Sequence, residues 1–476
     1  MNPPELCRLS ARTQRELVAR GELSCEELLK VHLQWIEAVN PEVNAICTLV
    51  PEAALEQARA ADKRLAGGAE ARPLEGLPIA IKDLVNTRGI RTTYGSPLFR
   101  DHVPDTDALH VSRIRAAGGV VIGKTNTPEW GAGSQTFNTL FGATATPFDT
   151  TRTAGGSSGG AAAALAARML PVADGSDLGG SLRNPAAFCN VVGFRPSPGR
   201  VADPARLQGW NPLPVLGPLA RSVDDAVLLL SVMAGADQHD PLTLDTEPGY
   251  FETSLDSDPS GLRVAWSADL GFLPVARSIR EVFEDSVGVF EVLGCLLEEA
   301  APDLRDGPDI FQTLRAHMFL AKYADYFENL RDQIKDTVQW NTRKGLEQSV
   351  LDVAMAEVAH RALYRRVVEF WQRFDFLILP ATQLPPFSKE LDWVREIEGV
   401  QFENYLQWME ICTVISLTGC PAISVPGGFT AEGLPVGLQI VGPPRCDLEV
   451  LRLAHAFEQA TGYAEREPDY QGPSEH

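Results

Sequence analysis

The chain has 476 residues and a mass of 51.7 kDa, a length that fits either two or three modules or one large α/β unit. Hydrophobic residues make up 44% and charged residues 22%, and no run of 18 or more apolar residues occurs, which excludes disordered, fibrous and membrane-spanning chains. Asp and Glu number 63 against 42 Lys and Arg, and the formal charge of −21 repels phosphate backbones and anionic lipid surfaces. We therefore expect neither nucleic acid nor a membrane as a partner.

The first half of the chain alternates helical and extended patterns. Apolar positions recur at helical spacing from residue 13 to residue 40, and Ser24 followed by Glu27 predicts a capping box on the second of two helices. Further along we expect helix 53–65, strand 77–81, helix 108–117, strand 120–122, helix 161–169 and strand 191–194. This alternation predicts a layered α/β architecture.

The second half completes the same core. Residues 270–375 are strongly helical and amphipathic, and residues 376–380 and 422–426 have the pattern of core strands that return to the same sheet. Residues 147–180 are rich in Gly, Ser and Thr but lie between structured segments, which favours a site built from loops over a flexible linker. We therefore expect one large domain over residues 1–476, with the helices of 1–65 and 270–375 packed on one core.

The cysteines and the N-terminus bear on cofactors and compartment. Eight cysteines are scattered along the chain, without a C-x-x-C pair or a histidine at metal-ligand spacing, which indicates small buried side chains and no structural zinc or disulfide framework. Residues 1–5 carry neither the basic nor the apolar region of an export signal, so the cytoplasm is the expected compartment. We expect no metal and no cofactor.

Residues 118–125 (GGVVIGKT) match the P-loop expression for phosphate binding. A phosphate cradle needs a strand before the loop and flexible residues within it. Here a predicted helix precedes the motif, and Val120, Val121 and Ile122 themselves favour a strand. A nucleotide site is therefore not expected.

Residues 155–160 (GGSSGG) contain the G-x-S-x-G pattern of an α/β-hydrolase nucleophile elbow. An elbow follows a strand, whereas residues 148–154 are polar. His455 is the only late histidine with an aspartate nearby, Asp447, and it lies on an apparent amphipathic helix. A Ser-His-Asp triad is therefore disfavoured.

A constellation without histidine remains: Lys82 after an apolar strand, Ser157 in the Gly-rich loop, and Ser181 24 residues later. Residues 155–160 and 175–186 (GSDLGGSLRNPA) closely resemble the signature block of the amidase signature family. The resemblance extends to residues 76–83 (GLPIAIKD), 123–126 (GKTN), 217–222 (GPLARS) and 433–439 (GLPVGLQ), and so covers most of the chain. It implies a mixed central β-sheet covered by helices on both faces.

The resemblance also implies a set of catalytic roles. Ser181 corresponds to the nucleophile, Ser157 to a bridging serine on a cis peptide bond, and Lys82 to the base. These roles are chemically reasonable, because a buried lysine amine is more readily neutral and only a neutral amine accepts a proton. Leu178, Gly179 and Gly180 precede the nucleophile in a segment whose backbone N–H groups can converge as an oxyanion hole requires.

Three further charged residues receive structural interpretations. Lys124 follows a strand and is expected to be solvated or paired. Asp177 and Arg183 are expected to tie the loop together by a charge-assisted hydrogen bond. Thr146 and Phe148 depart from the commoner family pattern of Asn and Trp, which leaves details of the pocket open.

The resemblance predicts an amidase that cleaves a small apolar or aromatic amide through a seryl acyl-enzyme. Trp130 and Gly131 align with a segment that lines the acyl pocket of fatty-acid amide hydrolase. Asn184 stands where malonamidase-like relatives carry an arginine, which disfavours a dicarboxylate half-amide. Four more aromatic residues together suggest an apolar acyl group: Trp340, Phe402, Tyr405 and Trp408. Each of them alone is better explained as part of the core.

Two alternatives stay open. The A-type subunit of a glutamyl-tRNA amidotransferase has a similar length, but residues 205–214 (ARLQGWNPLP) and Leu178 differ from its usual pattern. A non-catalytic scaffold of the same fold is the second alternative, and the intact Lys82, Ser157 and Ser181 argue against it. The oligomeric state is undetermined, with a homodimer as one option.

Overall fold

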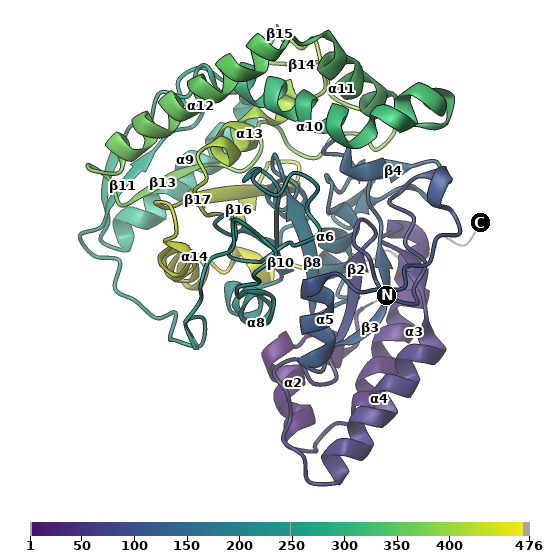
Figure 1. Ribbon diagram of the computed structural model, residues 1–476. Helices are drawn as coiled ribbons and strands as arrows, with labels where there is room; N and C mark the ends of the chain where they lie inside the picture. The colour runs from purple at the N-terminus through teal and green to yellow at the C-terminus, as the bar shows by residue number, and fades with distance from the viewer. Residues whose placement is uncertain (1, 248, 470–476) are drawn as a thin grey trace.

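The computed structural model describes residues 2–247 and 249–469 (Figure 1). Its helices are α1 (Glu5–Arg8), α2 (Ala11–Ala19), α3 (Cys25–Val43), α4 (Pro51–Ala66), α5 (Leu109–Ala116), α6 (Gly159–Ala166), α7 (Arg183–Phe188), α8 (Val223–Met233), α9 (Arg277–Val292), α10 (Gly307–Asn329), α11 (Asp336–Glu347), α12 (Val350–Phe370), α13 (Glu410–Leu417) and α14 (Asp447–Thr461). Its strands are β1 (Ile46–Leu49), β2 (Pro78–Lys82), β3 (Val120–Thr125), β4 (Phe137–Asn138), β5 (Gly142–Ala143), β6 (Ala145–Thr146), β7 (Asp149–Thr153), β8 (Val172–Asp177), β9 (Val192–Arg195), β10 (Val215–Ala220), β11 (Arg263–Trp266), β12 (Leu296–Glu299), β13 (Phe376–Pro380), β14 (Glu396–Ile397), β15 (Val400–Gln401), β16 (Ala422–Phe429) and β17 (Pro435–Val441).

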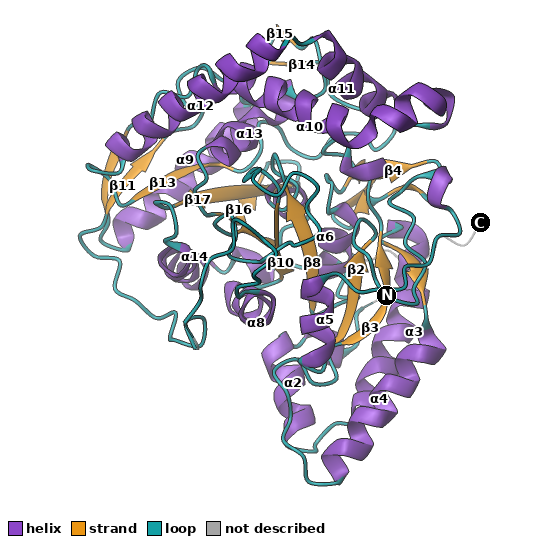
Figure 2. Cartoon of the chain, in the orientation of Figure 1, coloured by secondary structure: helices purple, strands orange, loops and turns teal. Residues whose placement is uncertain are grey.

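Eight strands form the main sheet, in the order β12-β11-β13-β17-β16-β9-β10-β8 (Figure 2). β11 pairs in parallel with β12 and β13, and the other neighbours are antiparallel, so the sheet is mixed. The strands predicted at 376–380 and 422–426 are β13 and the first part of β16. Both lie in this sheet, as the sequence indicated.

Helices cover both faces of the main sheet. Successive side chains of a strand point to opposite faces. Ile378 therefore joins one core cluster with residues of α8 and α14, whereas Leu377 and Leu379 join another with residues of α10, α12 and α13. Figure 2 shows these two groups of helices on either side of the strands. The predicted α/β class, with a mixed sheet between two helical layers, is confirmed.

A smaller sheet carries the strands predicted at 77–81 and 120–122. Its order is β1-β3-β2, with β2 and β3 parallel. β2 lies beside β8 of the main sheet, yet the two strands belong to different hydrogen-bonded sheets. Across this junction the backbone N–H of Lys82 donates to Oδ1 of Asp174, 2.8 Å away. A carboxylate therefore holds the end of β2, where a neighbouring strand would otherwise do so.

The predicted helices are present. α2 and α3 form the N-terminal pair, and Ser24 and Glu27 make the predicted capping box. Residues 270–375 supply α9 to α12 but also contain β12, an edge strand that the helical prediction missed. Its four residues are too few to show a period, and its Leu296 is 60% exposed. In the described ranges no helix combines the length and apolarity needed to span a bilayer.

Three strands near the Gly-rich segment were not predicted. β8 contains Gly175, and β10 contains Gly217 and Pro218, residues that are poor strand formers in isolation. Their antiparallel pairing places Gly217 opposite Gly175. The polar residues 149–153 form β7, which pairs with β6, so the expectation that no strand precedes the Gly-rich loop is wrong. Partly exposed polar strands of this kind lack the apolar alternation that sequence analysis relies on.

Candidate active site

Lys82 is the last residue of β2 and is fully buried. Its Nζ lies 2.8 Å from Oγ of Ser157, 2.7 Å from Oγ of Ser158 and 3.0 Å from Oγ of Ser176. These three hydroxyls come from two different segments, the Gly-rich loop and β8. The amine therefore lies at the point where the small sheet, the loop and the main sheet meet.

Burial lowers the pKa of Lys82 from 10.5 to about 7, and the negative charges of Asp174 and Asp177 oppose this shift. The ammonium form is disfavoured because burial removes its hydration. Near neutral pH a large fraction of the amine is therefore uncharged. An uncharged amine has a free lone pair and can accept a proton from a hydroxyl.

Ser157 lies in the loop between β7 and α6 and is only 3% exposed. The Gly156–Ser157 peptide bond is cis, as the family resemblance implied. Thr127 Oγ1 donates to the carbonyl of Ser157 at 3.0 Å, and Ser134 Oγ donates to that of Gly156 at 2.9 Å. Both carbonyls are thus fixed, which holds the hydroxyl of Ser157 toward Lys82.

Ser181 lies between β8 and α7 and is partly exposed. The backbone N–H of Ser158 donates to the carbonyl of Ser181 at 3.2 Å, so the two serine-bearing segments are joined directly. Lys82 touches Ser157 but makes no hydrogen bond to Ser181 in the described part of the chain. This arrangement suits a bridging serine between the amine and a more exposed hydroxyl.

The loop before Ser181 contains the predicted oxyanion-hole residues. The Gly180 N–H donates to Oδ1 of Asp177 at 2.8 Å, so this amide is engaged within the protein, in contrast to the expectation. Within the described residues the amides of Leu178 and Gly179 have no protein acceptor. A Cβ on Gly179 would lie 2.7 Å from the ring of Phe311, so α10 packs closely against the loop and a side chain at this position would have to displace that ring.

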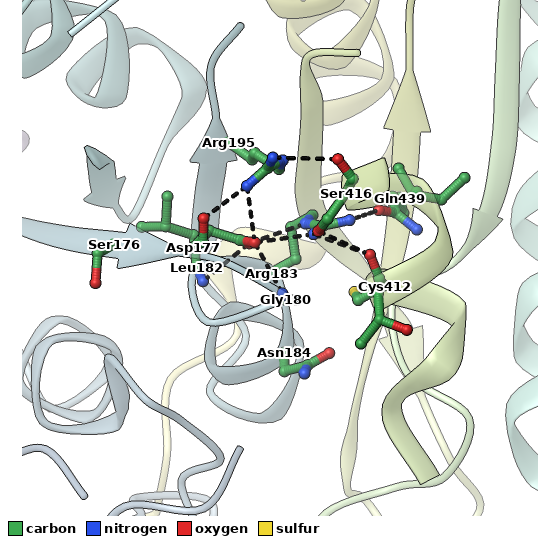
Figure 3. A network of polar contacts seen from close by, with 12 residues as sticks. Ser176, Asp177, Gly180, Leu182, Arg183, Asn184, Arg195, Cys412, Ser416 and Gln439 are labelled. Atoms are coloured by element: carbon green, nitrogen blue, oxygen red, sulfur yellow. Dashed lines mark hydrogen bonds and ion pairs between the residues drawn. The ribbon is translucent and has the colours of Figure 1, made fainter. Parts of the chain in front are cut away.

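Asp177 organises this loop through two arginines (Figure 3). Arg183 binds both of its carboxylate oxygens at 3.0 Å, which confirms the predicted pair, and Arg195 Nη1 lies 3.3 Å from Oδ1. All three side chains are fully buried. Burial alone would raise the pKa of Asp177, but the two guanidinium charges hold it well below its usual range. Arg195 was missed because it lies in β9, outside the motif.

Asp174 and His110 were also missed by the sequence analysis. Asp174 Oδ2 lies 3.1 Å from Nε2 of His110, on α5, and both side chains are buried. Asp174 Oδ1 accepts the Lys82 N–H described above. The pair is 64 residues apart in the sequence, and no short motif contains both members.

Trp130 and Gly131 lie beside the serines. A Cβ on Gly131 would be 3.6 Å from Oγ of Ser157. The Trp130 ring stacks on Tyr323 with centroids 4.5 Å apart, and Phe99 and Tyr326 flank it. An aromatic cluster therefore adjoins the loop that carries Ser157.

The other aromatic residues singled out in the sequence belong to the core around α10, α12 and α13. Trp408 is 1% exposed and packs against Phe188 and Phe387. Tyr405 is buried, and its hydroxyl accepts from Arg315 and Asn341. Trp340 and Phe402 pack at the border of the same cluster. These contacts support the core interpretation of all four residues.

Lys124 was expected to be solvated or paired, and in the structure it is buried and paired. It lies inside β3 and is fully buried, and its Nζ donates to the Val85 carbonyl and to the hydroxyls of Thr87 and Thr92. The residues of the P-loop expression form the α5–β3 turn and β3 itself, so no phosphate loop exists there. His455 faces Asp256, whereas Asp447 binds Arg200. The two residues of the disfavoured triad are therefore not paired.

Comparisons with known proteins agree with this geometry. Residues 27–451 match the family described as Amidase. An acylamidase of Rhodococcus erythropolis is 36% identical over 468 residues, 97% of each chain. The A-type subunit of the glutamyl-tRNA(Gln) amidotransferase of Carboxydothermus hydrogenoformans is 34% identical over 490 residues, 98% of this chain and 99% of its own. The two kinds of relative are therefore similarly close in sequence.

Solved structures show the same fold. A bacterial aryl acylamidase of the amidase signature family has a TM-score of 0.91 at 28% identity, over 96% of this chain and 97% of its own. The A-type subunit of the Thermotoga maritima glutamyl-tRNA(Gln) amidotransferase has a TM-score of 0.74 at 28% identity, over 96% of both. The chain thus belongs to the amidase family, and it is a serine amidohydrolase.

Proposed function

We propose that the chain hydrolyses the carbon–nitrogen bond of a small apolar or aromatic amide through an acyl-enzyme on Ser181. The contact that carries this proposal is the 2.8 Å hydrogen bond between the buried Lys82 amine and Ser157. A serine hydroxyl is a weak nucleophile until a base removes its proton. Lys82 is the base in this proposal, and Ser157 passes the proton from Ser181.

Acylation follows from these positions. The Ser181 Oγ forms a bond to the amide carbon while its proton moves to Ser157, whose own proton moves to Lys82. The electrons of the carbonyl bond move onto its oxygen, which accepts hydrogen bonds from the backbone amides of Leu178 and Gly179. Gly180 shapes the loop that carries these amides. The carbon–nitrogen bond then breaks, and the departing nitrogen takes a proton back through the same serines. Water then attacks the acyl carbon and gives a proton to Lys82 through Ser157; the bond from this carbon to the Ser181 Oγ breaks, the Oγ takes the proton back, and the carboxylate is released.

The aromatic cluster around Trp130 supports the proposed substrate class. It adjoins Ser157 through Gly131, and aromatic rings favour apolar and aromatic groups by stacking. The relative named as an acylamidase and the solved aryl acylamidase fit the same class.

A second candidate function is that of an A-type amidotransferase subunit, which would act on glutamine, because one such relative is 34% identical to this chain. The higher TM-score with the aryl acylamidase favours the first candidate. Ammonia release from glutamine and amine release from an anilide, both measured with the chain alone, separate the two. Turnover of glutamine but not of the anilide would replace the first proposal with the second.

The proposal extends to the organisation of the protein. Residues 1–476 act as a single amidase domain, in which α3 and α4 contact α6 and β3 respectively, and α9 contacts β13, β16 and β17. All eight cysteines have free thiols, which suits the proposed cytoplasmic location. A homodimer remains a prediction.

A fluorophosphonate is expected to label Ser181 covalently, because an activated serine attacks phosphorus as it attacks a carbonyl. Mass spectrometry of the digested protein identifies the labelled residue. Ser181→Ala should abolish the labelling, and Ser257→Ala, at an exposed position far along the chain, is the control and should not change it. Labelling at Ser157 would contradict the proposed roles, and no labelling at all would favour the non-catalytic scaffold.

Selectivity for aryl acyl groups is expected to depend on Trp130. The wild type should prefer a benzoyl amide to acetamide, and Trp130→Leu should lower this ratio of kcat/KM by roughly tenfold, because a ring-stacking surface is lost. Trp210→Leu, at a position that is 78% exposed, is the matched control and should leave the ratio unchanged. Equal ratios in the wild type and Trp130→Leu would place the acyl group elsewhere.

A further inference from the structure

Asp174 joins the catalytic lysine to a helix that contributes nothing else to the site. One carboxylate oxygen accepts the backbone N–H of Lys82 at 2.8 Å, and the other lies 3.1 Å from Nε2 of His110. Asp174 is in β8, Lys82 ends β2 and His110 is in α5. The carboxylate therefore connects three elements at the junction of the two sheets.

The surroundings of His110 indicate how the proton is placed. Its Nδ1 is buried and has no hydrogen-bond partner within the described chain. An imidazolium would leave a charged N–H there unpaired, which is costly, whereas a neutral ring leaves only an unused acceptor. The neutral ring that donates from Nε2 is therefore favoured. Asp174 then keeps its negative charge and accepts two hydrogen bonds.

We propose that Asp174, held by His110, is a positioning residue for Lys82: it fixes the end of β2 so that the amine reaches the serines, and it brings a buried negative charge to the same end of that strand. The proposal rests on the function proposed above, in which Lys82 is the base. Asp174 touches neither the substrate nor the reacting atoms, so its effect passes through Lys82.

The charge of Asp174 acts on the amine in a known direction. Burial lowers the pKa of Lys82, and the negative charges of Asp174 and Asp177 oppose this shift. The effect of Asp174 on the pKa is the larger of the two. The charge of Asp177 is compensated by Arg183 and Arg195.

Lys124 and Asp83 are further charged groups near this junction. Lys124 projects from β3, and its pKa is lowered to about 8 by burial, against the charges of Asp83 and Asp174. Asp83 follows Lys82 in the chain and accepts from Thr93. Neither contacts the Lys82 amine. Asp174 is therefore the group whose removal should change the amine most directly.

The test is the pH dependence of fluorophosphonate labelling at Ser181, which requires no knowledge of the substrate. In the wild type the labelling rate should fall on acidification with a midpoint near the Lys82 pKa of about 7. In Asp174→Asn the backbone acceptor is kept but the charge is lost. The ammonium form is then less stabilised, and the midpoint should move to lower pH by roughly one unit.

Asp225→Asn is the matched control. Asp225 is a buried carboxylate that also accepts two backbone N–H groups, from Ala11 and Arg12, but it does not act on Lys82. Its substitution should leave the midpoint of labelling unchanged. A purely structural role of Asp174 would lower labelling at every pH without moving the midpoint, and that result would overturn the proposal.

His110 variants keep the proposal testable if Asp174→Asn fails to fold. His110→Gln retains an N–H donor and should label within a few-fold of the wild type, whereas His110→Leu removes the donor and should label roughly tenfold more slowly. Equal rates for these two variants would also overturn the proposal. Failure of the proposed function looks different, because then the wild type would not label at Ser181 or Lys82→Met would label normally.

Discussion

Lys82→Met is expected to lower the rate of fluorophosphonate labelling at Ser181, and of amide hydrolysis, by roughly 10³-fold. Methionine nearly matches the length of the lysine stem and is tolerated in an apolar surrounding, but it cannot accept a proton. The fold should persist, because the variant no longer buries an ionisable amine. Labelling reactions quenched at a series of times and analysed by mass spectrometry measure the rate, and circular dichroism checks that the variant is folded.

The pH dependence of the wild type should follow from the same amine. The pKa of Lys82 is about 7 in the folded protein and 10.5 without burial, so activity should be lost as the pH falls through about 7. Between about pH 7 and pH 10.5 the unfolded chain binds more protons at Lys82 than the folded chain does. The free energy of unfolding should therefore rise with pH in this window. Lys82→Met should remove that component of the pH dependence of stability.

Lys124→Met is the matched control, because it makes the same change in a buried lysine of the neighbouring strand. The Nζ of Lys124 donates to Val85, Thr87 and Thr92 and touches none of the serines. This variant should be less stable, because three buried acceptors lose their donor, but its folded fraction should label at Ser181. Near-normal labelling in Lys82→Met, or a folded but inactive Lys124→Met, would show that the base lies elsewhere.

The sequence was sufficient to predict the residues that lie inside short motifs. The contacts between Lys82 and Ser157 and between Asp177 and Arg183 were predicted, because each of these residues belongs to a segment with a distinctive local pattern. The burial of Lys82 was also predictable, since it ends an apolar strand. The periodic helices and the strands at 376–380 and 422–426 were predicted for the same reason.

The parts that could not be predicted depend on contacts between distant segments. Asp174 and His110 meet only because β8 and α5 pack at the junction of the two sheets. The Gly180 amide was expected in the oxyanion hole, yet its direction depends on the Asp177 carboxylate, which no pattern of residues reveals. The burial of Lys124 was not predictable, because its partners lie in a loop 32 to 39 positions away.

Arg183→Met is expected to cost roughly 3–5 kcal/mol of stability, because removing one partner of a buried ion pair leaves the other poorly compensated. Arg183 binds both carboxylate oxygens of Asp177, and it also donates to Ser416 and Gln439. Urea unfolding at neutral pH measures the loss. Arg305→Met, which breaks an exposed pair with Asp303, is the control and should cost roughly 0–1 kcal/mol.

Measurements at acid pH show whether Arg183 stabilises the protein through its ion pair with Asp177 or only by packing. The pKa of Asp177 lies well below its usual 3.8, so the stability that the pair contributes is complete above that value and is lost as the pH falls below it. The difference in stability between the wild type and Arg183→Met should therefore narrow under acid conditions. Arg183→Met should also label at Ser181 more slowly than the wild type, because Asp177 holds the amides of Gly180 and Leu182, one on either side of the nucleophile. A variant that is destabilised equally at all pH values, with unchanged labelling, would show that Arg183 acts only by filling space.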